Sequence, residues 1–90
     1  MRAEGPTIHR KNIERFPGSL RELAAEIGNL RYDALTDFLR QLAAKLEADA
    51  ARDQGRGRPK LAAALRASAE GVAAAASHIE RAWRISEPHM

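Results

Sequence analysis

The chain has 90 residues, no cysteine and a formal net charge of +3 from 15 basic and 12 acidic residues. This length fits one domain near the lower limit of what folds alone, and the lack of cysteine excludes disulfides and thiolate metal sites. No run approaches the roughly 20 apolar residues that a membrane span needs, and the polar segment 1–15 lacks the apolar core of a secretory signal. We therefore expect a cytoplasmic protein without a membrane anchor. Its slight basic excess indicates nucleic-acid binding only if the charge is clustered.

Residues 1–18 are expected to form an arm ahead of the domain, which spans 19–86. Within the arm, residues 7–15 fit a short helix with Thr7 as its cap. Charges alternate along this segment, so the helix is marginal unless it docks, and the arm is otherwise flexible. The dipeptide Pro17-Gly18 then interrupts the chain.

A helix is predicted to begin at Ser19, because Ser19 and Glu22 have the spacing of a capping box, in which each side chain accepts a backbone N–H. Two sets of apolar residues follow with heptad spacing, and the second is shifted by one residue. One residue corresponds to about 100° of rotation, so a straight helix cannot keep both sets on one stripe. A bend or short break at Gly28-Asn29 is expected to absorb the shift, through a left-handed C-cap or a π-bulge. The first set is Leu20, Leu23, Ile27, Leu30 and Ala34; the second is Leu35, Phe38, Leu42 and Leu46, with the acidic Asp49 at its last position.

The clearest helical pattern lies between Lys60 and Arg84, where apolar positions recur at gaps of three and four residues. Pro59 stands at the first helical position, where its missing N–H would have no partner in any case. The glycine-bearing segment 54–59 ends the preceding helix after about Arg52 and turns the chain back. The stripe expected to face that helix consists of Leu61, Leu65, Ser68, Val72, Ala76, Ile79 and Trp83.

These elements predict an all-α fold: an antiparallel hairpin of two long helices with a bend near Gly28-Asn29. Equal numbers of residues counted outward from the turn at 54–59 along the two helices bring Trp83 beside Leu30, and therefore against that bend. One hairpin leaves half of each stripe uncovered, and alanine-rich stripes bury little area. Two hairpins packed together close a four-helix bundle. We therefore expect a homodimer that serves as a dimerisation or protein–protein interaction module, and a further protein partner is compatible with it.

No pattern in the sequence indicates catalysis, a metal site or a cofactor. There is no glycine-rich phosphate loop followed by Lys-Ser or Lys-Thr. His78 and Glu80 lie about 200° apart on a helix, so they do not form the Glu-x-x-His pair of a carboxylate metal site. The acid pair Asp33/Asp37 is typical of a solvated helix surface. We expect a protein that is not an enzyme.

One cluster of basic residues surrounds the turn between the two long helices. Such a cluster near a helix N-terminus can hold a phosphate or an acidic partner. The alternative is a turn without a binding role, because a surface turn is polar in any case. The candidate site consists of Arg52, Arg56, Arg58 and Lys60.

A helix-turn-helix DNA-binding protein is the alternative function class. Residues 20–28 resemble the first helix and turn of that motif, with Ala24 four residues before Gly28. However, the apolar positions after Gly28 come one residue later than in the motif. A recognition helix here would also turn the negative charges of Asp33 and Asp37 toward the DNA phosphates, which repel them. Nucleic-acid binding is therefore disfavoured relative to the dimer.

Three segments carry a family resemblance: Asn29-Leu30-Arg31-Tyr32-Asp33-Ala34-Leu35, Arg56-Gly57-Arg58-Pro59-Lys60-Leu61-Ala62 and His78-Ile79-Glu80-Arg81-Ala82-Trp83. Together they resemble small uncharacterised helical proteins of cyanobacteria. The resemblance covers the chain from about residue 20 to its end. It implies a cytoplasmic protein that is not an enzyme, and it implies no particular activity or site residue.

Overall fold

The computed structural model describes residues 9–89, and all regular structure in this part of the chain is helical. Three α-helices, α1 (Leu20–Gly28), α2 (Tyr32–Gly55) and α3 (Pro59–Ser86), are followed by the 3₁₀ turn η1 (Glu87–His89). The predicted all-α class is thus confirmed. None of the helices within residues 9–89 is both long and apolar enough to cross a membrane.

The predicted capping box is present at the start of α1. Ser19 Oγ accepts a hydrogen bond from the Glu22 N–H at 3.1 Å, and Glu22 Oε1 accepts one from the Ser19 N–H at 2.7 Å. These bonds satisfy two donors that the first helical turn cannot pair by itself. The backbone N–H of Ser19 also holds the pKa of the Glu22 carboxyl below its usual range.

The helix expected at 7–15 is wrong for the part of it that the structure describes. Residues 9–19 contain turns and bends but no helix, whereas Thr7 lies outside the described residues. The alternating charges of this segment leave it no continuous apolar side with which to dock, which is the condition that a helix this short requires.

A short break separates α1 from α2 at the predicted position. The C-cap residue Asn29 has right-handed torsion angles (φ −86°, ψ −2°), and its N–H bonds to the carbonyls of Ala25 and Glu26. Neither of the two expected devices is used: among the described residues only Gly57, in another turn, has a positive φ, and residues 9–89 contain no π-helix. Three non-helical residues, 29–31, absorb the shift instead.

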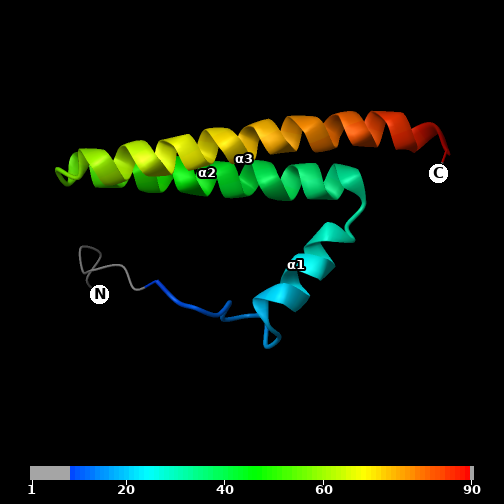
Figure 1. Cartoon of the computed structure of the whole chain (residues 1–90), viewed down its shortest axis with the longest axis horizontal. Coiled ribbons are helices and arrows are strands. Elements are labelled where there is room, and N and C mark those ends of the chain that lie inside the picture. The colour runs from blue at the N-terminus through cyan, green and yellow to red at the C-terminus, as the bar shows by residue number, and fades with distance from the viewer. Residues whose placement is uncertain (1–8, 90) are drawn as a thin grey trace.

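The two long helices lie side by side and run antiparallel, and α1 leaves one end of this pair at an angle (Figure 1). The turn between them depends on Gly57, whose φ of 75° falls in the left-handed region that favours glycine. Pro59 then occupies the first turn of α3, as predicted. α2 runs to Gly55, three residues beyond the expected end.

The contact between α2 and α3 is made by small side chains. On each helix the buried residues recur at every seventh position, which keeps them on one stripe. Because helices approach one another as closely as the side chains between them permit, this alanine seam brings the two backbones near each other. The seam consists of Thr36, Ala43 and Ala50 of α2 and Ala62, Ala69 and Ala76 of α3.

The stripes of larger apolar residues that were predicted to fill this contact lie beside it. The prediction is therefore wrong about which side of each helix faces the other helix. Of the predicted α3 stripe only Ala76 is buried, and of the shifted α2 stripe no residue is buried. Leu61 is 45% exposed, and Phe38 and Leu42 are each 38% exposed. No large side chain in the described part of the chain is fully buried. The alanine heptad takes the contact because it permits the closer approach.

The chain exposes more surface than a folded protein of its size usually does. Its accessible surface is 7187 Å², whereas a compact monomer of 9.9 kDa exposes about 5,200 Å². Its radius of gyration is 15.9 Å, against about 12 Å for a compact domain of this length. The non-helical segment 9–19, which is almost entirely exposed, contributes to this difference together with the elongated helix pair and the position of α1 away from it.

Candidate interaction face

Two ion pairs join α2 to α3 on one side of the alanine seam. Arg40 donates to Glu80 at 2.9 Å, and Arg66 donates to Glu47 at 3.2 Å. Arg84 contacts the second oxygen of Glu80 at 3.3 Å. The hydrogen bond from Arg40 holds the pKa of Glu80 below its usual range. These exposed pairs contribute little stability, but they show which sides of the two helices adjoin.

The large apolar side chains lie on the opposite side of the seam. At about 100° per residue, Arg40 and Leu42 fall on opposite sides of the buried Ala43, and Arg66 and Val72 are likewise separated by the buried stripe of α3. Because the ion-paired sides adjoin, the two apolar sides also form one surface, which we call the apolar face. It consists of Leu35, Phe38, Leu39, Leu42 and Leu46 of α2 and Leu61, Leu65, Val72, Ile79 and Trp83 of α3.

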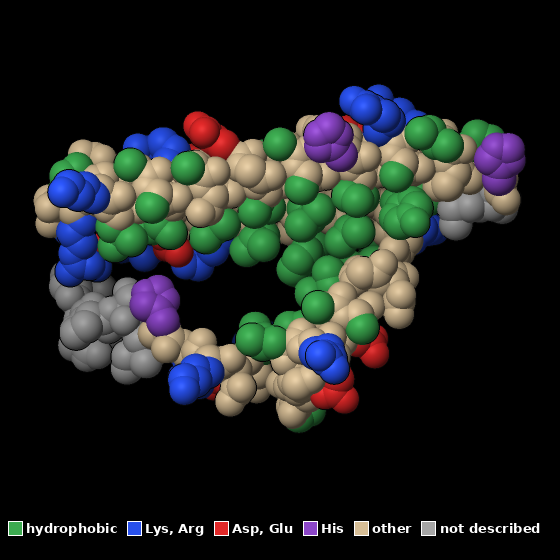
Figure 2. Space-filling view, viewed as in Figure 1, with side chains coloured by type: hydrophobic (Ala, Val, Ile, Leu, Met, Phe, Trp, Pro, Cys, Tyr) green, Lys and Arg blue, Asp and Glu red, His purple; other side chains and the backbone are tan. Residues whose placement is uncertain are grey.

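The apolar face is only partly covered within the chain. Figure 2 shows hydrophobic side chains along the edge of the helix pair that is turned toward α1, with an opening between that edge and α1. Three members of the face, Phe38, Leu42 and Leu61, are exposed, and the others are half-buried. The face therefore presents leucine and phenylalanine to the opening along most of the length of the pair.

Trp83 closes the end of the apolar face that lies at the break between α1 and α2. It lines a shallow pocket of about 400 Å³ together with Gly28, Asn29 and Tyr32. The guanidinium carbon of Arg31 lies 5.4 Å from the centre of the indole ring, a cation–π contact. The predicted placement of Trp83 against the Gly28-Asn29 region is confirmed.

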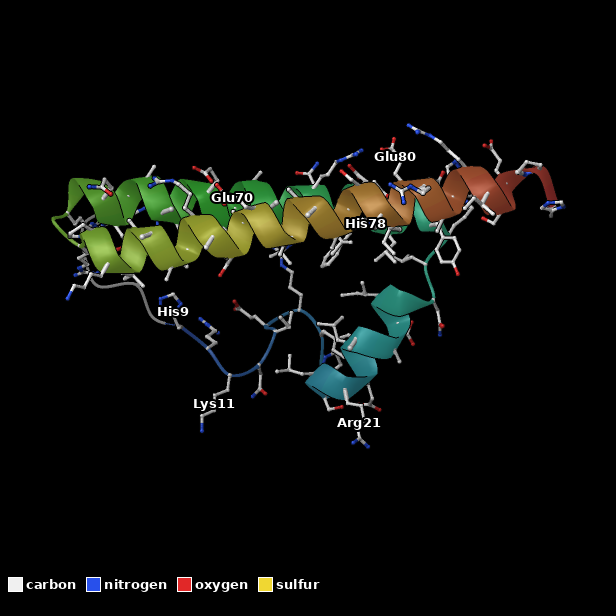
Figure 3. All side chains as sticks on the ribbon, turned by 45° about the horizontal axis from the view of Figure 1, so that its top comes forward. His9, Lys11, Arg21, Glu70, His78 and Glu80 are labelled. Atoms are coloured by element: carbon white, nitrogen blue, oxygen red, sulfur yellow. The ribbon has the colours of Figure 1, made fainter. Side chains whose placement is uncertain are left out.

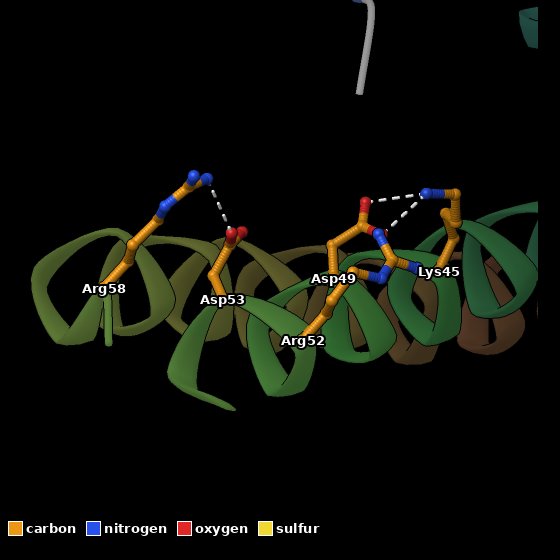
Figure 4. Close-up of polar contacts among 5 residues, drawn as sticks. All are labelled: Lys45, Asp49, Arg52, Asp53 and Arg58. Atoms are coloured by element: carbon orange, nitrogen blue, oxygen red, sulfur yellow. Dashed lines mark hydrogen bonds and ion pairs between the residues drawn. The ribbon is translucent and has the colours of Figure 1, made fainter. Parts of the chain in front are cut away.

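Two of the basic residues at the tip of the helix pair, Arg52 and Arg58, are bound to neighbouring acids (Figure 4). Arg52 donates to Asp49 at 3.1 Å, and Arg58 donates to Asp53 at 3.4 Å. Lys45 donates to both carboxylate oxygens of Asp49 at 2.7 Å. The hydrogen bond from Lys45 is the main reason that the pKa of Asp49 lies below its usual range.

The structure thus places the four predicted tip residues on one turn without making them a uniform cationic cluster. Arg52, Arg56 and Arg58 line a cavity of about 310 Å³, together with the two aspartates. Lys60 is exposed in the first turn of α3. Sequence reasoning missed Lys45 and Asp49, although their i,i+4 spacing was a signal for the pair. An anion- or partner-binding role for the tip stays a prediction.

Replacing both Arg56 and Arg58 with serine is expected to leave the melting temperature nearly unchanged, because exposed surface substitutions alter stability by about 0.5 kcal/mol or less. Thermal unfolding followed by circular dichroism, with and without inorganic phosphate, measures this. A rise in melting temperature with phosphate that the double variant loses would identify the tip as an anion site. A large loss of stability without phosphate would show that the arginines are structural instead.

His9 lines the cavity at the tip together with Asp49 and Asp53. His78 lies on α3, far along the chain from His9, and both are exposed (Figure 3), as is His89 in η1. Within residues 9–89, no three His, Cys, Asp or Glu side chains come together in an arrangement that could hold a metal ion.

Comparison of the chain with protein-family models, curated proteins and solved structures finds no match. The resemblance to small helical proteins of cyanobacteria therefore stays a prediction. Any functional conclusion rests on the geometry of the apolar face and of the elements around it.

Proposed function

We propose that the chain is a dimerisation module in which the apolar face packs against the same face of a second copy. The antiparallel helices then form one hairpin of a four-helix bundle, an arrangement in which each hairpin covers the other's uncovered side. The main support for the proposal is that the helix pair has an ion-paired side and an apolar face on opposite sides of the alanine seam. Alanine fills the contact within the pair, whereas Phe38, Leu42 and Leu61 remain exposed on one side.

The length of the apolar face supports a second hairpin as the partner, because the face follows helices of 24 and 28 residues. Each protein contributes about 800 Å² to a standard interface, and obligate dimers bury more. A self-complementary contact also needs no second gene product, since a two-fold axis brings the same face of both copies together.

The proposal assigns no enzymatic role to the chain. The side chains of the apolar face include no nucleophile or general base, and Asp49 and Arg52, which line the tip cavity with Leu61 and Leu65, bind one another. A face of this composition excludes water and binds another apolar surface.

Replacing Leu42 with aspartate is expected to dissociate the dimer, because each of two symmetry-related copies then places a carboxylate in an apolar contact. At several kcal/mol for an unpaired buried charge, the dissociation constant should rise at least about 100-fold. Sedimentation velocity at micromolar concentration measures this. The matched control is Ala44→Asp, which places the same charge on the ion-paired side and should leave the dimer intact. A wild-type chain that melts cooperatively as a monomer at these concentrations would refute the proposal.

DNA binding is the alternative, and the helix–break–helix arrangement of α1 and α2 is its only support. α2 continues for 24 residues, and its first turn carries Asp33, which binds Arg31 at 2.7 Å. A mobility-shift assay with random duplex DNA distinguishes the two functions. Binding that weakens steeply with salt would favour the DNA-binding alternative over the dimerisation module.

A further inference from the structure

α1 is an amphipathic helix that stands away from the helix pair, and its apolar side is only partly covered. Leu20, Leu23 and Ile27 recur at gaps of three and four residues and so share one side of the helix. None of the nine residues of α1 is buried, and Leu20 is 57% exposed. A helix this short is marginal in water unless its apolar side packs against another surface.

The apolar surface nearest to α1 is the apolar face of its own chain. Figure 2 shows hydrophobic side chains on the edge of α1 that is turned toward the helix pair, across the opening from the apolar face. Arg21 and Glu22, on the other side of α1, are exposed. Only residues 29–31 join α1 to α2. A connection this short gives the face an effective concentration at α1 in the millimolar range, about 1000-fold above a second copy at micromolar concentration.

The connection between α1 and α2 has room to bend. Arg31 is fixed to the helix pair, because its side chain binds Asp33 at 2.7 Å and lies over the ring of Trp83. At Gly28, no atom of another element lies within 4 Å of the position that a Cβ would take. Leu30, between the two, is 39% exposed. A rotation at residues 29 and 30 therefore changes the angle of α1 while the contacts of Arg31 stay intact.

The length of α1 matches the part of the apolar face nearest the break. Counted outward from residues 29–31, position 28 is level with position 32, and position 20 is level with position 40. Folded back on the helix pair, α1 extends about 12 Å along α2. Leu20 then lies between the levels of Phe38 and Leu42, each of which is 38% exposed. The apolar side of α1 and these two side chains would cover one another.

We infer that α1 is a lid: it folds back on the half of the apolar face nearest the break and, in most monomers, closes it to a second copy. The inference rests on the proposed function, because the lid regulates the dimerisation proposed above. The lid and a second hairpin need the same side chains, Phe38 and Leu42, so the dimer forms only from open copies. The closed fraction then raises the apparent dissociation constant of the dimer.

The test compares two neighbouring substitutions on α1, Leu20→Ser and Arg21→Ser, by sedimentation velocity. Leu20→Ser removes an apolar contact of the closed lid and none of the dimer, so it should tighten the dimer. Burial of a leucine is worth about tenfold or more in an equilibrium constant. With most monomers closed, the dissociation constant should therefore fall at least about threefold. Arg21→Ser, on the solvent side of α1, should change it by less than about twofold.

The sign of the effect distinguishes the lid from its alternatives. A dissociation constant that rises with Leu20→Ser would show that α1 packs against the second copy. Equal dissociation constants for the two variants would show that α1 does not compete for the face. Either result would overturn the lid and leave the dimer in place.

Hydrogen exchange gives a second readout on the wild-type chain. Protection of the α1 amides should be highest in the dilute monomer and should fall as the dimer forms with rising concentration. Leu20→Ser should lower this protection in the monomer, whereas Arg21→Ser should not. Protection of α1 that is equal in monomer and dimer, or greater in the dimer, would overturn the lid. A wild-type chain that stays monomeric would remove the proposed function, and the protection of α1 in that monomer would still decide whether the lid closes.

Discussion

Replacing Ala76 with aspartate is expected to unfold the protein at room temperature. Ala76 has no exposed surface and lies in the seam where α2 and α3 approach most closely. A carboxylate there loses its hydration without gaining a partner, which costs several kcal/mol. A domain of this size has only about 3–5 kcal/mol of net stability from its core. Far-ultraviolet circular dichroism at 25 °C, followed through a thermal scan, measures the loss of helix.

Ala74→Asp is the matched control for this substitution. Ala74 is exposed on the same turn of α3, so the new carboxylate stays in water and costs only the difference in helix propensity, below about 1 kcal/mol. Its melting temperature should fall by a few degrees at most. If the two variants melted together, α2 and α3 would not be in contact at Ala76, and the fold described above would be wrong.

Replacing Trp83 with alanine is expected to destabilise the protein by about 2–4 kcal/mol, toward the lower end of the range for aromatic truncation because the indole is only half-buried. The substitution removes the side chain that contacts the break between α1 and α2, and it also removes the cation–π contact with Arg31. Urea denaturation measures the change. Ile85→Ala is the control, because Ile85 lies two residues away and is 66% exposed.

Fluorescence tests the same contact without a substitution, since Trp83 is the only tryptophan. Its emission maximum should lie to the blue of free indole in water and should move to the red on unfolding. An emission maximum that already matches free indole, and stays there in denaturant, would show that Trp83 is solvated and that the pocket at the break is not formed.

The parts of the fold that the sequence predicted correctly depend on residues close together in the chain. The capping box needs only Ser19 and Glu22, and the start of α3 needs only Pro59 at a position where proline is tolerated. The break after Gly28 was visible as a shift between two heptad sets. Its geometry was not, because a right-handed cap, a left-handed cap and a π-bulge produce the same shift.

The phase of the helix contact could not be predicted from periodicity. The Lys60–Arg84 segment carries alanine on every side, so the leucine stripe was the only one that stood out. The heptad that contains Ala62 and Ala69 lies directly beside it. Periodicity identifies which side of a helix is apolar, but it does not distinguish a contact with the adjacent helix from a contact with another molecule.

The candidate binding residues were likewise predicted only in part, because local patterns do not show which residues meet in the folded chain. The tip arginines were identified by composition, whereas their pairing with Asp49 and Asp53 was seen only in the structure. The apolar face was present in the sequence as two stripes. That both lie on one side of the helix pair followed only from the inter-helix ion pairs, which no local pattern indicated.

The alanine seam has a consequence for how this protein can vary. The spacing of α2 and α3 is set by positions such as Ala43 and Ala69, whereas the surface available for association is set by positions such as Phe38 and Leu42. Substitutions at the second group can therefore alter affinity or partner choice while the distance between the helices stays constant. Substitutions at the first group are restricted to the smallest side chains. The spacing of the helices and the surface for association usually depend on the same core residues. Here they depend on separate heptad positions, so each can change without the other.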